Sequence, residues 1–346
     1  LILFSLLLSL LSFSLSRRAL PHYTINLDLS PEERFKEVNI AMKDNMIKAK
    51  EFLLGKVPAI IVKILSGFAW LRHENDEIKQ EIEAFSNHTG VPLSQARLLN
   101  LLYEVSTIQG TEAFSEMCLG VVMTTPENTI YHGRNLDLEG KEYFSAILYD
   151  ATFIRGEEEL FTAQMIAGYH GIVSGMKKGK FGISEATRTN SSVWDILGMV
   201  WNVVGGTTQP AWLMRKVLED SQSYLEAKDR LLNVKITSPI YFILSGLIGS
   251  EGVIISRDID GPANVRELAD SGSFIVQANK DAFDPEQQDD SRRTNAEKYL
   301  SQVELNPENL FKTINHEGVR QTTTFWQGVY SAQASSWYSS APEKDD

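Results

Sequence analysis

Residues 116 to 140, EMCLGVVMTTPENTIYHGRNLDLEG, contain the only cysteine of this 346-residue chain. Cys118 opens a run of apolar and β-branched residues, and a second such run begins at Thr129. Between the runs lies Thr125-Pro126-Glu127-Asn128, which suits a type I turn because proline is favoured at its second position. The stretch therefore predicts an antiparallel hairpin with strands over 118–125 and 129–137.

The register of this hairpin decides which side chains share a face of the sheet. If Thr125 pairs with Asn128, Cys118 lies opposite Asn135. Alternation of side chains then places Asp137 on the same face as Cys118, one diagonal step away. All of these groups lie at one end of the hairpin.

Arg134 falls on the opposite face in this register, unless the strand bulges at Gly133. A thiol, a guanidinium and a carboxylate at one end of a hairpin could activate a nucleophile, because a nearby cation favours a thiolate and a carboxylate can orient a proton or an amine. The alternative is a surface ion pair of Arg134 and Asp137 beside a packed cysteine, since lone cysteines are often small buried hydrophobes. The hairpin by itself leaves both interpretations open.

The chain after the hairpin consists of short β-branched and aromatic runs separated by turn residues, which predict further antiparallel strands. These runs cover 159–168, 170–175, 179–184, 240–246, 252–258 and 273–279. Helical stretches are predicted within the series at 193–203, 210–232 and 291–302. Grouped strands with segregated helices indicate an α+β layered sandwich rather than a doubly wound sheet.

The chain before Cys118 is predicted to be mostly helical. Apolar residues recur every three or four positions from Ser30 to Leu53, after a Ser-Pro start that suits a helix N-terminus. Residues 93–108 form another helical stretch. The run AIIVKILSGFAWL at 59–71 is more evenly apolar, so it is either a buried helix or a surface that contacts lipid.

The first sixteen residues, LILFSLLLSLLSFSLS, contain only Leu, Ile, Phe and Ser. They are shorter than the ~20 residues of a membrane helix, so they predict a signal peptide over 1–16, possibly extending to about residue 18. A short membrane anchor is the alternative. Glycosylation sequons at Asn87 and Asn190 are compatible with passage through the secretory route.

Composition narrows the classes of protein. With 43% hydrophobic residues, the chain can bury a substantial core as one large domain or two smaller ones. Its 33 basic and 45 acidic residues give a net charge of −12, which argues against nucleic acid as a partner because a phosphate backbone would not be neutralised. An acidic chain of this kind suits a compartment where some carboxylates are protonated.

Familiar catalytic and metal motifs are missing. The six histidines have no metal-binding spacing, and a single cysteine excludes a thiolate zinc site. No P-loop, no GxGxxG after a strand and no GxSxG elbow is present. A papain-like site with His132 or His170 as base is possible in principle, but the flank of Cys118 lacks that family's local signature, and His132 fits a structural role in its strand better.

The motif YHGRNLD (131–137), one strand and a turn after the cysteine, resembles the signature of the acid ceramidase and N-acylethanolamine acid amidase family of N-terminal-nucleophile hydrolases. Further similar segments follow in order along the chain: PHYTINLDLSPEERF (21–35), NLLYEV (100–105), AGYHGIVSG (167–175), YFILSGLIGSEGVIISRDIDGPA (241–263), VQANKDAF (276–283) and DDSRRT (289–294). The resemblance implies a layered αββα sandwich of antiparallel sheets. It also implies cleavage between Met117 and Cys118, which divides the chain into a helical α-subunit over 19–117 and a catalytic β-subunit over 118–346.

The same resemblance implies roles for individual residues. Cys118 becomes the N-terminal nucleophile, and its freed α-amine serves as the general base. Arg134 and Asp137 match the family's catalytic Arg and Asp. Asn279 matches the asparagine that helps to hold the oxyanion, and Arg292-Arg293 matches an arginine pair of which the first is usually implicated. These roles suit the cleavage of an amide, which requires a nucleophile, a proton shuttle and donors aimed at the developing oxyanion.

This chain departs from the family pattern at several positions. Leu119-Gly120 stand where the family usually has Thr-Ser, and Ala278 and Lys280 flank Asn279 in place of Thr and Tyr. QGTEAFSEM (109–117) is an apparent insertion before the scissile bond. These departures keep open the alternative of an inactive, lipid-binding relative.

The resemblance therefore predicts a lysosomal or secreted acid amidase that acts on a fatty N-acyl amide and uses no metal or organic cofactor. Its expected partners are the lipid substrate, a membrane or vesicle surface met through 59–71, and the second subunit of the α/β heterodimer. The single cysteine excludes the inter-subunit disulfide expected in acid ceramidases, which favours N-acylethanolamines, whereas 174–188 is more similar to ceramidases. A cysteine peptidase is a further alternative.

Overall fold

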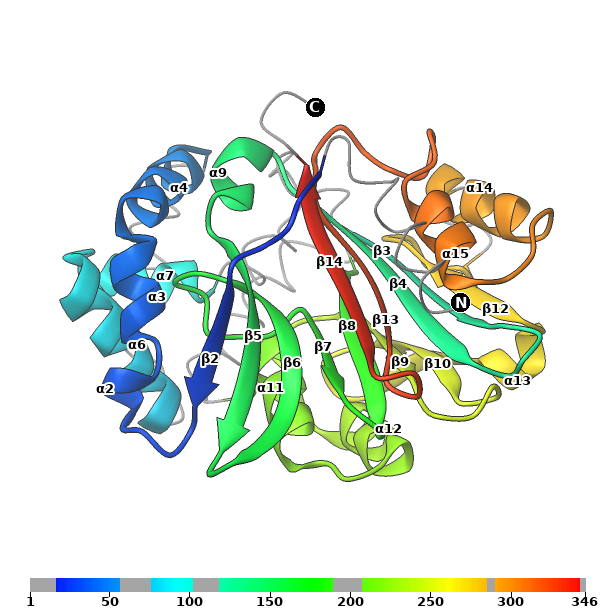
Figure 1. Ribbon diagram of the computed structural model, residues 1–346, viewed down its shortest axis with the longest axis horizontal. Coiled ribbons are helices and arrows are strands. Elements are labelled where there is room, and N and C mark those ends of the chain that lie inside the picture. The colour runs from blue at the N-terminus through cyan, green and yellow to red at the C-terminus, as the bar shows by residue number, and fades with distance from the viewer. Residues whose placement is uncertain (1–16, 57–75, 102–117, 189–206, 285–289, 343–346) are drawn as a thin grey trace, which may run out of the picture.

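The computed structural model describes residues 17–56, 76–101, 118–188, 207–284 and 290–342. Two β-sheets pack face to face, and helices cover the outside of both (Figure 1). The first sheet has six strands, which are in order β1 (Arg17–Arg18), β14 (Ser336–Pro342), β13 (Thr324–Ser331), β4 (Ile130–Asp137), β3 (Cys118–Thr124) and β12 (Phe274–Gln277).

The second sheet has eight strands and faces β3 and β4 through β8 and β9. Its strands are in order β11 (Pro262–Glu267), β10 (Gly252–Arg257), β9 (Ile240–Ser245), β8 (Phe181–Thr187), β7 (Ser174–Lys177), β6 (Glu158–Ile166), β5 (Leu148–Arg155) and β2 (His22–Asn26). The β-branched and aromatic residues of these strands supply most of the buried core between the sheets.

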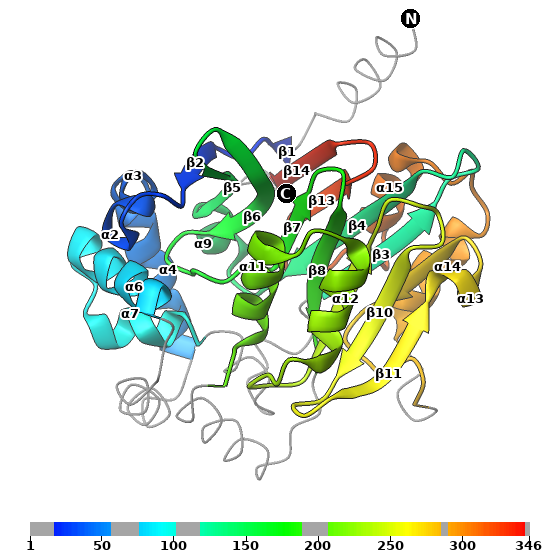
Figure 2. The ribbon, with the colours of Figure 1, turned by 90° about the horizontal axis from the view of Figure 1, so that it is seen from below.

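Helices complete four layers. On the outer face of the six-stranded sheet, α14 (Ser291–Leu300) and α15 (Pro307–Ile314) pack against β12, β4 and β13, while α11 (Pro210–Asp220) and α12 (Tyr224–Asn233) cover the other sheet (Figures 1 and 2). Two short helices, α9 (Lys141–Ser145) and α13 (Leu268–Ser271), lie in connections. The predicted α+β sandwich is confirmed, with one correction: β2 pairs with β5 in parallel, so the second sheet is not wholly antiparallel.

The N-terminal helices gather at the β2 edge of the sandwich, where Figure 1 shows them in blue and cyan. They are α2 (Pro31–Arg34), α3 (Lys36–Ala41), α4 (Lys43–Lys56), α6 (Asp76–Thr89) and α7 (Leu93–Leu99). The single helix expected from Ser30 is broken at Phe35 and Met42, whose φ angles are −107° and −105°. Both side chains nevertheless lie in the core, because the apolar periodicity continues across the breaks.

The segment before Cys118 also supplies a strand to each sheet. Its β1 pairs with β14, and its β2 pairs with β5. The N-terminal part is therefore built into the sandwich and does not form a separate layer.

Several predicted features lie outside the described residues: the signal peptide at 1–16, the apolar run at 59–71, Met117, Asn190 and the helix at 193–203. The other sequon residue, Asn87, is exposed on α6. None of the helices in the described part of the chain combines the length and the apolar character required to span a membrane.

Candidate active site

The hairpin that begins at Cys118 has a register one residue away from the predicted one. Asn128 N–H donates to Thr125 O, as in a type I turn, but Asn128 adopts a left-handed conformation with φ 64°. The loop therefore gains one residue, and Thr125 bonds to Thr129 instead of pairing with Asn128. As a result Cys118 lies opposite Leu136.

This slip of one residue moves Arg134 to the face that carries Cys118. Arg134 pairs with Gly120, and the ladder continues through Gly133 without a bulge, so the expectation that Arg134 points away is wrong. Arg134 Nη2 donates to Cys118 Sγ at 2.8 Å. The guanidinium is fully buried, and its Nε and Nη1 have no hydrogen-bond partner in the part of the chain that the structure describes.

Asn279 reaches Cys118 from the other neighbouring strand. β12 pairs with β3 up to Gln277 opposite Gly120, so continuing the ladder for two residues brings Asn279 beside Cys118. Cys118 N donates to Asn279 Oδ1 at 3.1 Å, while Asn279 Nδ2 donates to Thr187 O at 2.8 Å. The amide oxygen of Asn279 thus holds the nitrogen that cleavage would convert into an α-amine.

Asp137 occupies the opposite face from Cys118, contrary to the prediction, again because of the register. There it meets α14: Arg292 Nη1 donates to Asp137 Oδ2 at 3.3 Å, and Arg292 Nη2 donates to Asn279 Oδ1 at 2.6 Å. Arg292 therefore links Asp137 to the Cys118 nitrogen through Asn279. The neighbouring Arg293 has Arg266 and Glu297 as electrostatic partners.

Sequence reasoning missed three groups around the site. Asp290 caps α14 by accepting from Arg292 N–H and Arg293 N–H, and it also accepts from Asn279 N–H. An aspartate directly before a helix is a readable N-cap signal. Thr324 donates to Asp137 Oδ1 from β13, a strand that the sequence did not reveal.

The third group is a buried ion pair that anchors the segment carrying Asn279. Arg188, next to Thr187, donates through Nε and Nη2 to the two carboxylate oxygens of Asp281, both at 2.8 Å. Tyr241 also donates to Asp281. No local motif predicts this pair, because its members are 93 residues apart.

Burial dominates the electrostatics of the thiol. Desolvation raises the pKa of Cys118 above its ordinary value, and the charges of Asp137 and Glu185 add to this, while Arg134 opposes it. The thiol is therefore neutral at acid and neutral pH, and a nucleophile at this position needs a base to remove its proton.

Neither candidate histidine contacts the thiol. His132 lies between the sheets, stacks on Tyr330, and bonds through Nε2 to Ser184 Oγ at 2.8 Å and through Nδ1 to Ser245 Oγ at 3.3 Å. Burial and the charge of Arg134 lower the pKa of His132 to about 3. His170 bonds to Asn100 at the N-terminal helices, and burial lowers its pKa to about 4. These positions fit structural roles.

The described residues contain no group of three or more His, Cys, Asp or Glu side chains that could hold a metal ion. The polar groups around Cys118 instead form a buried arrangement of a thiol, a guanidinium with unpartnered donors, and an amide oxygen on the backbone nitrogen. Such a set can perform nucleophilic attack on a carbonyl and stabilise the oxygen that becomes negative.

Comparison with known proteins places this chain in a family. The family described as the beta subunit of N-acylethanolamine-hydrolyzing acid amidase matches residues 18–70. The matched residues lie within the segment that precedes Cys118. An N-acylethanolamine-hydrolyzing acid amidase of Caenorhabditis elegans is 28% identical over 322 residues, which cover 89% of this chain and 88% of that protein.

An acid ceramidase of Bos taurus is 30% identical over 314 residues, covering 83% of this chain and 76% of that protein. A solved structure of a Caenorhabditis elegans N-acylethanolamine-hydrolyzing acid amidase ortholog superposes with a TM-score of 0.57 at 27% identity, covering 62% of this chain and 93% of that one. The chain belongs to the family of acid ceramidases and N-acylethanolamine-hydrolyzing acid amidases. It is thus related to amidohydrolases that act on lipid amides.

The departures at 119 and 120 fit the packing of this chain. Leu119 is buried against the apolar cluster under α14 and α15. A Cβ at Gly120 would collide with Ile243 Cδ1 of the opposite sheet, so glycine suits this position.

Proposed function

We propose that this protein is a self-cleaving acid amidase that hydrolyses fatty N-acyl lipids, with Cys118 as its nucleophile. The observation that carries the proposal is the placement of Cys118 on β3, with Arg134 on its sulfur and Asn279 on its nitrogen. A nucleophile whose own nitrogen is held beside the reacting atom can use that nitrogen as a base once it is free.

Cleavage comes first. The Cys118 sulfur attacks the carbonyl carbon of Met117, the bond between that carbon and the Cys118 nitrogen breaks, and the nitrogen takes the thiol proton. Water then hydrolyses the thioester, which releases the carboxylate of Met117 and restores the thiol. The products are an N-terminal chain and a catalytic chain that begins with a free α-amine.

Amide hydrolysis repeats the same chemistry on the lipid. The α-amine removes the thiol proton, the sulfur attacks the amide carbonyl, and the amine of the substrate leaves with that proton. Water releases the fatty acid from the thioester. The unpartnered Nε and Nη1 of Arg134 are available to the carbonyl oxygen as it becomes negative.

The α-amine must be a base in an acid environment. A free α-amine has a reference pKa of ~7.7–8.0, so near pH 5 it would be almost wholly protonated. The positive charge of Arg134 disfavours a second cation nearby and thus lowers that pKa. Asp137 acts in the opposite direction on that pKa, and its bond to Arg292 supports a role in positioning Asn279 and the amine.

The substrate is proposed to be an N-acylethanolamine or a ceramide, presented at a membrane or vesicle surface by the 59–71 run. A lysosomal or secreted location agrees with an apolar leader at 1–16 and with the sequons at Asn87 and Asn190. Turnover of ceramide and of palmitoylethanolamide by the processed protein at acid pH tests activity and substrate class together. Comparing turnover of a vesicle-presented substrate with that of a soluble fluorogenic amide tests whether 59–71 contacts the lipid surface.

Two alternatives make different predictions. A silent lipid-binding relative would appear as one chain on a denaturing gel after incubation at acid pH, whereas the proposed enzyme appears as two chains. A cysteine peptidase would require a histidine that serves Cys118, and neither His132 nor His170 contacts that thiol. Absence of both processing and amide turnover would overturn the proposal.

A further inference from the structure

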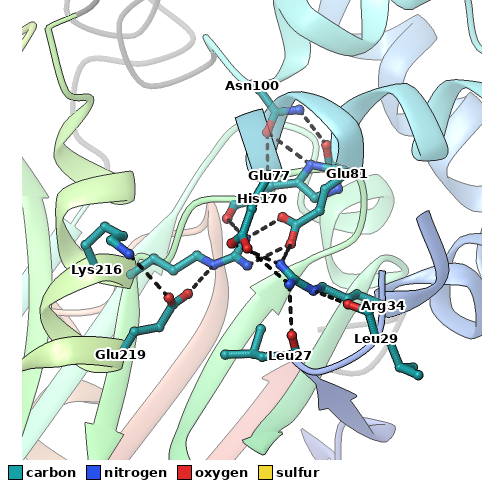
Figure 3. Close-up of polar contacts among 11 residues, drawn as sticks. Leu27, Leu29, Arg34, Glu77, Glu81, Asn100, His170, Lys216 and Glu219 are labelled. Atoms are coloured by element: carbon teal, nitrogen blue, oxygen red, sulfur yellow. Dashed lines mark hydrogen bonds and ion pairs between the residues drawn. The ribbon is translucent and has the colours of Figure 1, made fainter. Parts of the chain in front are cut away.

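A second cluster of buried charges lies where the N-terminal helices meet the body of the sandwich (Figure 3). The central acidic residue of this cluster is Glu81 on α6, which precedes the expected cleavage point in the sequence. Its main basic residue is Arg215 on α11, which follows that point. The two residues are 134 positions apart in the chain. None of these groups takes part in the mechanism proposed for Cys118.

The contact between Glu81 and Arg215 has two parallel hydrogen bonds. Arg215 Nη1 donates to Glu81 Oε2 at 2.6 Å, and Nη2 donates to Oε1 at 2.8 Å. Arg34 of α2 adds a third bond, from its Nη1 to Glu81 Oε1 at 3.0 Å. On the other side, Arg215 Nε donates to Glu219 Oε1 at 2.9 Å. The planar guanidinium matches the carboxylate in a geometry that a lysine could not reproduce.

Water is excluded from this contact. The side chains of Glu81 and Arg215 are 0% and 2% exposed. Arg215 also lies over the rings of Phe35 and Phe153, which come from opposite sides of the cleavage point. Removing one partner of a buried ion pair strongly destabilises the folded protein, because the other charge remains buried and loses that partner.

A neutral contact beside the ion pair crosses the same boundary. Asn100, at the end of α7, accepts from His170 N–H at 2.8 Å and donates to Gly168 O at 2.9 Å. Gln209 Nε2 donates to Asn100 O at 3.0 Å. Figure 3 shows that Asn100 and Glu81 both extend from the N-terminal helices toward the same part of the sandwich.

The surroundings of Glu81 favour its charged carboxylate. Burial alone would raise the pKa of Glu81, but the charge and hydrogen bonds of Arg215 and the hydrogen bond from Arg34 outweigh burial and hold that pKa below its ordinary value. The contact is therefore compatible with the acid conditions in which the enzyme is proposed to work.

We propose that Arg215 is the docking site on the catalytic chain for the Glu81 carboxylate of the cleaved N-terminal chain, and that this contact keeps the two chains together in register. The inference rests on the proposed cleavage before Cys118, which would leave the halves without a covalent link. The only cysteine of the sequence is Cys118, so a disulfide between the chains is not available. The apolar core supplies attraction between the two chains. The two parallel hydrogen bonds between Arg215 and Glu81, here called the fork, fix the position of α6 on the sandwich.

The test separates docking from self-cleavage. A site for a sequence-specific protease is inserted between Gly110 and Thr111 of the full-length Cys118→Ala protein, and the chain is cut with that protease. Dilution followed by gel filtration then measures how tightly the two fragments stay associated. Failure of the protein with Cys118 to process itself would appear in a separate sample and would leave this measurement unaffected.

Glu81→Gln is expected to weaken the association by about 10²- to 10³-fold, because it removes the carboxylate that forms two hydrogen bonds with buried Arg215 across the boundary and leaves only Glu219, on the same helix, as a charged partner. The double variant Glu81→Met/Arg215→Met should recover much of that loss, because neither buried charge of the fork remains. Lys56→Gln is the matched control: Lys56 and Glu139 also form an ion pair across the boundary, at 2.9 Å, but their side chains are 40% and 46% exposed. This control should bind as tightly as the parent.

Melting of the uncut variants checks that each one folds. If uncut Glu81→Gln does not fold, Arg215→Lys provides the same test, because it keeps the charge and loses the fork. Fragments of Glu81→Gln or Arg215→Lys that remain as tightly associated as those of the parent would overturn the proposal. A double methionine variant that is no tighter than Glu81→Gln would do the same.

Discussion

Two buried arginines, Arg134 beside Cys118 and Arg215 beside Glu81, have opposite surroundings. Arg215 has acceptors on all three nitrogens, from Glu81, Glu219 and the His170 backbone. Arg134 has a single hydrogen-bond contact, to the Cys118 sulfur, and its Nε and Nη1 are without a partner among the described residues. Both guanidiniums are nevertheless almost fully buried.

We interpret this difference as that between a structural charge, Arg215, and a charge with the catalytic role proposed for Arg134. A buried donor without a partner costs about 1–3 kcal/mol of stability. In the proposed mechanism the substrate carbonyl would accept hydrogen bonds from these donors of Arg134. The acceptors of Arg215 all belong to the protein. Substitution of Arg134 should therefore mainly change turnover, whereas substitution of Arg215 should mainly change stability.

The largest effect is expected at the nucleophile. Cys118→Ala should remain a single chain and hydrolyse no amide, because both cleavage and turnover need the sulfur. Denaturing gels after incubation at acid pH and N-terminal sequencing of the fragments check this. A Cys118→Ala protein that matures normally, or a parent fragment that begins elsewhere than Cys118, would refute the mechanism.

The second-largest effect on turnover is expected at Asn279. Asn279→Ala removes the acceptor of the Cys118 nitrogen and an amide donor close to the site, and loss of one oxyanion donor typically costs ~10²–10³ in turnover. The measurement is kcat of fully cleaved protein. Asn279→Asp keeps the acceptor oxygen and serves as the companion variant. Unchanged turnover of cleaved Asn279→Ala would exclude the residue from the site.

Exchanging each arginine for lysine tests the comparison directly. Arg134→Lys keeps the charge but loses the planar guanidinium, and a hydrogen bond to a charged group contributes ~1.5–3 kcal/mol, so turnover should fall by about 10- to 150-fold. The melting temperature should change little. Arg215→Lys should show the reverse: a lower melting temperature with kcat of the intact complex unchanged. Equal effects on both properties in both variants would contradict the distinction.

The smallest effect on activity is expected at His132. Because its pKa is about 3 in the folded protein and ordinarily 6.5, the unfolded chain takes up a proton first as the pH falls. The stability that neutral His132 contributes is complete above pH 6.5 and is lost as the pH falls toward 3, by about 1.4 kcal/mol per pH unit.

Glutamine does not titrate, so the stability advantage of the parent over His132→Gln should shrink over that range. Urea unfolding of both proteins at several pH values measures this difference, and the measurement at pH 7 serves as the reference. The acid limb of the turnover profile should stay in place, because His132 is not the base. A stability difference that does not vary with pH would contradict the buried neutral histidine.

Local sequence patterns predicted strands and helices well where turn residues or helix-capping residues mark both ends of the element. The runs at 118–125, 240–246 and 252–258 correspond to β3, β9 and β10, and the paired helices at 210–232 correspond to α11 and α12. The sequence did not reveal β5, β13 and β14, nor α6 and α15. For β14, SWYSSAP is largely polar and small, so its place in the sheet depends on its neighbour β13.

The hairpin pattern pointed to Cys118, Arg134 and Asp137, and the resemblance added Asn279 and Arg292, but neither predicted how these residues are arranged. Cys118, Arg134, Asn279 and Arg292 do lie together in the structure. The predicted faces of Arg134 and Asp137 were both wrong for a single reason: side chains alternate with a period of two, so one extra loop residue exchanges the faces of a whole strand. The left-handed conformation of Asn128 could not be deduced from the turn signal alone.

The sequence by itself determined the kind of protein this is: a chain with helices before its single cysteine, strands after it, and motifs in the order of one amidase family. It also singled out Cys118 as the candidate nucleophile, because no other cysteine is present in the sequence. Only the tertiary structure decided which groups meet that sulfur, and which charge joins the N-terminal helices to the sandwich. The physical reason is distance along the chain: Asn279 is 161 residues from Cys118 and Arg215 is 134 from Glu81, so their contacts depend on how sheets and helices pack and not on local preference.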